Sequence, residues 1–206
     1  MDRGDILTSL AASYDAYAHE REANGEPEWR DDIRLDFSSR LPTGGRVLEI
    51  GAGAGHTAKW FHDQGFDITA TDLAPANIEL CRAKGVKAEV RDMADLGFES
   101  ESLDGVWAAS CLMHIADVDL PDVLREISHV LKPTGFFWAG TWGGDDSEGI
   151  WQDDFYEPKR FYSIRSDDRM RAFYEPQFTV LSFDGFDPRP DLDWHYQSAL
   201  LRKEHP

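Results

Sequence analysis

An apolar run that ends in three alternating glycines constrains the fold of this chain more than any other feature. Residues 46–50 read Arg-Val-Leu-Glu-Ile, a pattern typical of a short, buried parallel strand. Gly51, Gly53 and Gly55 follow at once, and residues 56–64 have helical spacing. Glycine reaches positive φ and lets the backbone touch a ligand. A strand, a glycine turn and a helix in this order predict a ligand site at the carboxyl end of a sheet.

Strand and helix signals alternate along the chain. Strands are expected at residues 66–71, 86–90, 103–109 and 135–142, with helices at 75–84 and 120–131. This alternation predicts right-handed βαβ units and a parallel sheet with helices on both faces. Two final strands, 178–183 and 194–201, are joined by a loop too short for a crossover helix and must pair antiparallel. The expected fold class is therefore α/β, with an antiparallel hairpin at one edge of the sheet.

The chain has 206 residues, which suits a single domain, 1–206. We expect a short helix at 165–172 and a long loop at 143–165. The domain then has three parts: an N-terminal helical cap at 1–40, a core at 45–140, and a substrate-side loop with the terminal hairpin at 143–206.

The formal net charge is −18, and acidic residues outnumber basic ones in each third of the chain. Binding to DNA or RNA needs a basic surface, so a nucleic-acid partner is not expected. No segment has the apolar core of a signal peptide or the roughly 20 apolar residues of a membrane span. Cys81 and Cys111 lack the spacing of a metal site or a disulfide framework. These features predict a cytoplasmic protein that binds neither membrane nor metal.

Two carboxylates follow the second and third expected strands. Asp72 closes the second strand, where a carboxylate can accept both hydroxyls of a ribose. Asp92 follows the third strand and can accept an adenine amino group, while Met93 packs on the ring. These residues predict a pocket for an adenosine with something attached. A dinucleotide-binding loop would need its third glycine at position 56, which His56 occupies.

With these motifs the sequence resembles the class I S-adenosylmethionine-dependent methyltransferases of small molecules. The resemblance is firm over residues 45–140 and rests on four motifs: Glu49-Ile50-Gly51-Ala52-Gly53-Ala54-Gly55, Thr71-Asp72-Leu73, Arg91-Asp92-Met93, and Leu103 to Trp107 leading to Cys111-Leu112-Met113-His114. It implies a Rossmann-like seven-stranded sheet of order 3-2-1-4-5-7-6 with strand 7 antiparallel. It also implies S-adenosylmethionine as cofactor and S-adenosylhomocysteine as product.

The resemblance assigns the cofactor site residue by residue. Gly51 and Gly53 would approach the methionine part, and Glu49 would organise the loop and help to bind the ammonium. Asp72 would bind the ribose, and Asp92 with Met93 the adenine. The remaining candidates lie along the methionine part, beside the loop, or on the N-terminal helices, where core packing is an equal alternative: Ser110, Cys111, Gly55, Leu73, Tyr14 and Trp29.

The family reaction is an in-line displacement on the sulfonium methyl, which alignment accelerates. A base is needed only where the acceptor must lose a proton. His114 follows the fourth strand and is the first catalytic candidate, and His195 is the second. The alternatives are a capping or core histidine at 114 and a strand-surface residue at 195.

Aromatic and basic residues are dense after the core. The substrate-site candidates are Trp142, Tyr156, Arg160 and Tyr162, with Lys159 and Arg165 nearby. Such a wall would suit a small aromatic or apolar acceptor, with or without a carboxylate, unless these aromatics only pack on the sheet edge. The chain would be a monomer or homodimer.

Three functions remain open. The first is methyl transfer to an N, O or C atom of a small molecule. The second is a NAD-type oxidoreductase. The third is a non-catalytic S-adenosylmethionine-binding module, or a protein that puts this cofactor to another use.

Overall fold

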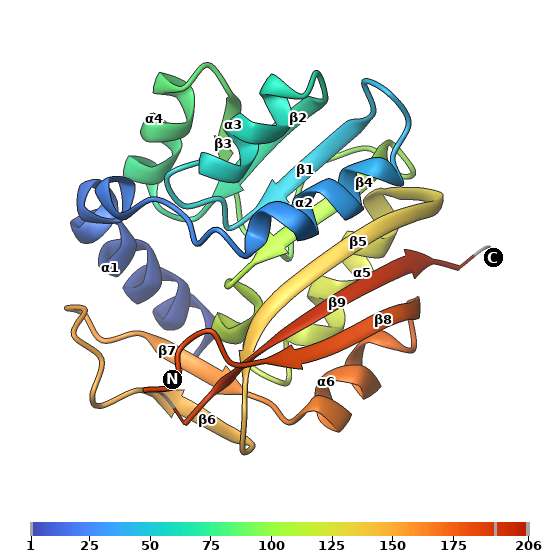
Figure 1. The fold of residues 1–206 in the computed structure, drawn as a ribbon. Coiled ribbons are helices and arrows are strands. Elements are labelled where there is room, and N and C mark those ends of the chain that lie inside the picture. The colour runs from blue at the N-terminus through green and yellow to red at the C-terminus, as the bar shows by residue number, and fades with distance from the viewer. Residues whose placement is uncertain (1, 192, 205–206) are drawn as a thin grey trace.

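The computed structural model describes residues 2–191 and 193–204, so the outermost ends of the expected domain and residue 192 lie outside the described part (Figure 1). Its helices are α1 (Arg3–Asn24), α2 (Arg30–Ser39), α3 (His56–Asp63), α4 (Pro75–Ala83), α5 (Leu120–Val130) and α6 (Asp167–Tyr174), with a 3-10 turn, η1, at Leu112–His114. The strands are β1 (Arg46–Ile50), β2 (Asp67–Asp72), β3 (Lys87–Val90), β4 (Leu103–Ala109), β5 (Leu131–Gly143), β6 (Ser147–Ile150), β7 (Phe161–Ile164), β8 (Phe178–Phe186) and β9 (His195–Lys203).

Seven strands form one sheet in the order β3-β2-β1-β4-β5-β9-β8. The first five are parallel, and β9 runs antiparallel to both β5 and β8. With β6 and β7 left out of the numbering, this is the order 3-2-1-4-5-7-6 expected from the sequence. The α/β class, the order and the antiparallel terminal hairpin are confirmed.

The stretch expected as a long loop, 143–165, is different. It contains a separate two-stranded antiparallel sheet in which Ser147 pairs with Ile164 and Ile150 with Phe161. All four residues of β7 are buried, so the strand has no alternation of apolar and polar side chains. A four-residue strand beside glycine and aspartate carries no periodicity from which its pairing could be predicted.

Packing on both faces of the sheet explains the apolar pattern of the central strands. On one face, Trp107 of β4 and Trp138 of β5 are register partners, and their rings stack with centroids 3.8 Å apart. On the other face, Phe137 packs in the core that also holds Leu124 and Ile127 of α5. These helix residues lie three apart, which places them on one face of α5.

Helix α1 lies between α4 and the β6–β7 hairpin (Figure 1). Polar contacts hold it at both sides. Asp15 accepts a hydrogen bond from the Ala76 backbone N–H at the start of α4, and Ser13 donates to the Pro158 carbonyl before β7. The helical cap is therefore confirmed as helices, and it spans the carboxyl edge of the sheet. Among the described residues, no helix is long and apolar enough to cross a membrane.

Truncation of Phe137 tests this core. Its side chain is fully buried, so Phe137→Ala should leave a cavity and lower the free energy of unfolding by about 3–5 kcal/mol. Leu35→Ala is the control, because Leu35 is 56% exposed, and it should change stability by less than about 0.5 kcal/mol. Urea denaturation followed by tryptophan fluorescence measures both. Equal effects of the two substitutions would contradict this account of the core.

Candidate functional site

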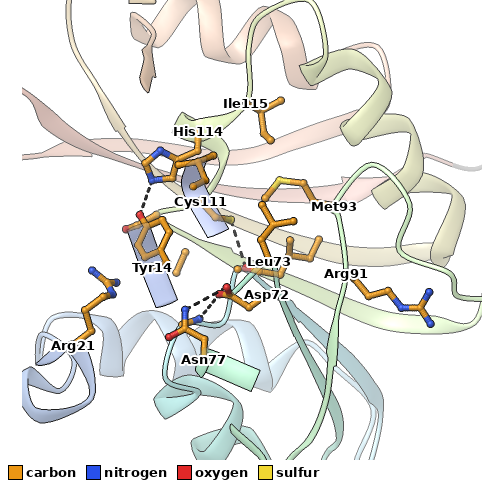
Figure 2. A pocket seen from close by; sticks show the side chains of 16 residues that line it. Tyr14, Arg21, Asp72, Leu73, Asn77, Arg91, Met93, Cys111, His114 and Ile115 are labelled. Carbon is orange, nitrogen blue, oxygen red and sulfur yellow. Dashed lines mark hydrogen bonds between the residues drawn. The ribbon is translucent and has the colours of Figure 1, made fainter. Parts of the chain in front are cut away.

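A cavity of about 610 Å³, counted to its open mouth, lies at the carboxyl ends of β1, β2 and β4, beneath α1 (Figure 2). The glycine loop after β1 separates it from a second hollow of about 460 Å³. Five residues line both spaces: Arg21, Gly51, Gly53, Ala109 and Ser110. The two spaces therefore form one site that wraps around the loop.

Glycine stands at positions 51 and 53 of the loop for different physical reasons. Gly51 has φ +64°, and a Cβ atom there would lie 2.5 Å from the Cβ atom of Cys111, so only glycine packs against the end of β4. Gly53 has φ +53°, but a Cβ atom there would meet nothing within 4 Å. At Gly53 the backbone is therefore bare toward open space, as the approach of a ligand to the loop requires.

Asp72 ties this loop to the end of β2. Its carboxylate accepts hydrogen bonds from the backbone N–H of Gly53 (2.8 Å), the backbone N–H of Ala74 (2.9 Å) and the Asn77 side-chain amide (3.2 Å). Burial raises the pKa of Asp72, and these donors oppose the rise. Because Oδ2 accepts only the Gly53 bond, it keeps a lone pair for a ligand. Asp72 lines the cavity as expected, and its contact with a ribose stays a prediction.

The expected adenine side is only partly assembled. Leu73 and Met93 line the cavity, but Asp92 does not. Both oxygens of Asp92 accept from the Arg3 guanidinium, at 2.6 and 2.5 Å, and Oδ1 also accepts from the Ala94 N–H. The sequence shows where Asp92 lies but not that α1 brings an arginine to it. In this structure Arg3 and the Ala94 N–H occupy Asp92, and its contact with adenine stays a prediction.

Two buried polar side-chain atoms beside the second hollow have no hydrogen-bond partner among the described residues. Glu49 is 2% exposed, and its Oε2 has no hydrogen-bond partner among the described residues. Burial raises the pKa of Glu49 well above its usual range, and the nearby Glu26 carboxylate raises it further. The buried Nε of Arg30 is likewise without a described partner. A ligand with an ammonium and a carboxylate would satisfy both atoms, so these residues fit the amino-acid end of S-adenosylmethionine.

Trp29, another cofactor candidate, lies elsewhere. It lines neither hollow and packs against Tyr196 and Phe186, with ring centroids 4.8 and 5.1 Å away. Tyr14, by contrast, lines the larger cavity, as do Ser110 and Cys111. Arg91, which belongs to one of the motifs but was given no role, also lines the cavity. Sequence reasoning missed other lining residues, because their types carry no motif: Leu10, Arg21, Asn77 and Ile115.

His114 and Tyr14 meet at the wall of the cavity (Figure 2). The Nε2 atom of His114 lies 2.6 Å from the Tyr14 hydroxyl, and its Nδ1 atom lies 2.7 Å from the Phe161 carbonyl oxygen. Burial lowers the pKa of His114 to about 3; the Phe161 carbonyl opposes this shift, while the Arg160 and Arg21 cations add to it. The imidazole is therefore neutral at physiological pH.

The expected substrate residues do not line the cavity. Trp142 packs on Tyr196, and Tyr162 packs against Trp151 and Trp194. Arg160 forms a buried ion pair with Asp154, and its Cζ atom lies 3.6 Å from the centroid of the Tyr156 ring. These side chains pack against one another and against α1 and β9, which is the alternative given above, and their contact with a substrate stays a prediction.

His195, Lys159 and Arg165 also have partners away from the cavity. His195 lies at the start of β9, outside the cavity lining, with Nε2 2.7 Å from Asp167. Arg165 is buried and paired with Asp117, and Lys159 donates to the Gln152 carbonyl. His195 is thus held by Asp167 away from the cavity lining, and its catalytic role stays a prediction.

Comparisons with known proteins agree with this geometry. The family model described as a methyltransferase domain matches residues 48–139. The ubiquinone biosynthesis O-methyltransferase of Xanthomonas oryzae pv. oryzae is 32% identical over 118 residues, which are 53% of this chain and 48% of that protein. Methyltransferase GfsG of Streptomyces halstedii is 32% identical over 111 residues, or 50% of this chain and 38% of that protein. The chain thus spans about half the length, or less, of these curated relatives.

Two solved structures show the same fold. The Burkholderia thailandensis 1,6-didemethyltoxoflavin-N1-methyltransferase, solved with S-adenosylhomocysteine, has a TM-score of 0.81 at 22% identity and covers 100% of this chain and 92% of its own. The [4+2]-cyclase SpnF has a TM-score of 0.71 at 18% identity, and the match covers 88% of this chain and 84% of SpnF. Residues 48–139 therefore match the methyltransferase-domain family, and the chain shares the fold of S-adenosylmethionine-dependent methyltransferases.

Proposed function

We propose that this protein transfers a methyl group from S-adenosylmethionine to an N, O or C atom of a small molecule. The observation that carries this proposal is the loop at Gly53, which is bare toward the cavity and hydrogen-bonded to Asp72. The curated relatives named above are methyltransferases, and the toxoflavin-type structure is named for a small heterocyclic acceptor. Those names support the chemistry and a small acceptor, and leave the methylated atom open.

The residues divide the cofactor between the two hollows. We infer that Leu73 and Met93 flank the adenine and that the free lone pair of Asp72 accepts a ribose hydroxyl. Glu49 and Arg30 would bind the amino-acid end, where their orphaned atoms lie. When bound, the cofactor supplies a methyl group already activated by its sulfonium charge.

The chain's own contribution is alignment and the exclusion of water. Helix α1 covers the cavity, with Leu10 and Tyr14 in its lining. His114 is unsuited to act as a base, because its imidazole is desolvated and holds a proton only near pH 3. Burial also raises the pKa of the Cys111 thiol far above neutrality. These residues therefore hold the reacting groups in line and do not remove a proton themselves.

A second use of the cofactor has a specific observation in its favour. SpnF shares this fold and is named as a [4+2]-cyclase. A site in which His114 and Cys111 are unsuited to remove a proton would also suit a reaction in which no proton is removed. Incubation with methyl-tritiated S-adenosylmethionine and panels of amines, phenols and carboxylates separates the two: a labelled product supports methyl transfer.

Replacement of Asp72 tests the cofactor site. Asp72→Asn puts an amide where N–H donors now converge, so the variant should bind S-adenosylhomocysteine roughly 10- to 100-fold more weakly by calorimetry. Asp67→Asn, at the exposed start of the same strand, should bind like the wild type. NAD should not bind to either protein. Wild-type binding of NAD but not of S-adenosylhomocysteine would overturn the proposed function.

The state of His114 predicts a pH dependence of stability. The folded chain holds this imidazole neutral down to about pH 3, whereas an unfolded chain protonates it near pH 6.5. The contribution of His114 to the free energy of unfolding is therefore fully present above pH 6.5 and is lost as the pH falls from there toward 3. Urea denaturation between pH 7.5 and 5 should show the wild type losing up to about 1.4 kcal/mol per pH unit more than His114→Gln. If the free energy of unfolding depended on pH equally in the two proteins, the low pKa of His114 would be refuted.

A further inference from the structure

We propose that the Tyr14 hydroxyl is a hydrogen-bond acceptor fixed toward the reacting end of the cavity, so that the site favours a nucleophile that carries a hydrogen. This inference rests on the proposed function. It concerns a residue that sequence reasoning placed only with the cofactor. The directions of the hydrogen bonds around Tyr14 decide whether its hydroxyl donates or accepts.

The Phe161 carbonyl sets that direction. A carbonyl oxygen can only accept, so Nδ1 of His114, 2.7 Å away, must carry the hydrogen. Because the imidazole is neutral, Nε2 has no hydrogen and can only accept. The Tyr14 hydroxyl, 2.6 Å from Nε2, must therefore donate its hydrogen to His114. Tyr14 has no hydrogen left to offer to a ligand.

A second contact uses one lone pair of the Tyr14 oxygen. The Nη1 atom of Arg160 donates to this oxygen at 3.0 Å. Asp154 holds the guanidinium in place through Nε and Nη2, at 2.8 and 2.9 Å, and both partners are at least 94% buried. The arginine therefore cannot turn away, and the Tyr14 oxygen keeps one lone pair for another donor.

The place of Tyr14 in the cavity lining indicates which ligand group that lone pair would meet. Tyr14 and His114 lie on one side of Cys111 in Figure 2, and Met93 lies on the other. If Met93 and Leu73 flank the adenine, the wall formed by Ser110, Cys111 and Tyr14 surrounds the opposite, reacting end. A ligand group there meets an oxygen that can only accept.

This polarity favours one class of acceptor. An amine, a heterocyclic nitrogen or a hydroxyl that carries a hydrogen can donate it to Tyr14, which orients its remaining lone pair. As that atom gives up electron density to a methyl group, its hydrogen becomes more acidic and the bond to Tyr14 strengthens. A tertiary amine or an ether would instead face the Tyr14 lone pair with a lone pair of its own.

Sinefungin provides a probe that needs no knowledge of the acceptor, because it carries an ammonium group in place of the sulfonium methyl. Calorimetry should show that the wild type binds sinefungin about 10-fold or more tightly than S-adenosylhomocysteine, which has no donor there. Tyr14→Phe should reduce this ratio to near one and change the S-adenosylhomocysteine affinity by less than about 3-fold.

Two further variants make the test specific. Tyr17→Phe is the matched control, because Tyr17 lies on the same helix, bonds to the Phe155 carbonyl and does not line the cavity; its ratio should equal that of the wild type. His114→Leu frees the Tyr14 hydrogen to turn into the cavity, so it should also lower the ratio. This variant decides the matter if Tyr14→Phe does not fold.

The outcomes separate this inference from the proposed function. A wild type that binds neither compound contradicts the proposed function itself. Binding of S-adenosylhomocysteine without any preference for sinefungin, or a preference that survives in folded Tyr14→Phe and His114→Leu, overturns the role of Tyr14 alone.

Discussion

The hydrogen bond from the Gly53 backbone to the Asp72 carboxylate is the contact on which the site depends. Asp72 is the last residue of β2, and β2 pairs in parallel with β1, which leads into the glycine loop. The loop is also bonded to β2 through the Ala52 N–H and the Thr71 carbonyl. A turn with three left-handed glycines would be mobile by itself. Anchored at two points to the neighbouring strand, it holds one shape and separates the two hollows.

The sequence was sufficient wherever the signal is local. The strand before Gly51, the place of Asp72 at the end of β2 and the terminal hairpin each follow from a short run of residues, and all were predicted correctly. The partners of side chains were not predictable in this way. Asp92 stands where a cofactor carboxylate is expected, yet Arg3, 89 residues earlier, occupies it. Only the tertiary position of α1 brings these two residues together.

The net charge of the chain likewise did not predict which cationic side chains are already paired. In a chain with a charge of −18, Arg160 stood out as a group that could bind an anion. Its partner, Asp154, lies only six residues earlier, and the pair is buried beneath Tyr156. An excess of acidic residues makes such pairing easy to satisfy, so an arginine among aromatic residues is weak evidence for an anion site. Arg21, which drew no attention in the sequence, lines both hollows instead.

The β6–β7 hairpin, which the sequence predicts as a loop, fixes the hydrogen bonds of residues in the cavity wall. Its strand β7 supplies the Phe161 carbonyl, which fixes the tautomer of His114, and the segment before it supplies Arg160. Without that carbonyl, His114 could present either nitrogen to Tyr14, and the hydroxyl could point its hydrogen either way. The polarity of the cavity wall is therefore set by backbone that does not touch the cavity. A residue-type motif cannot encode this, because every residue has a carbonyl and only the strand pairing decides where that carbonyl points.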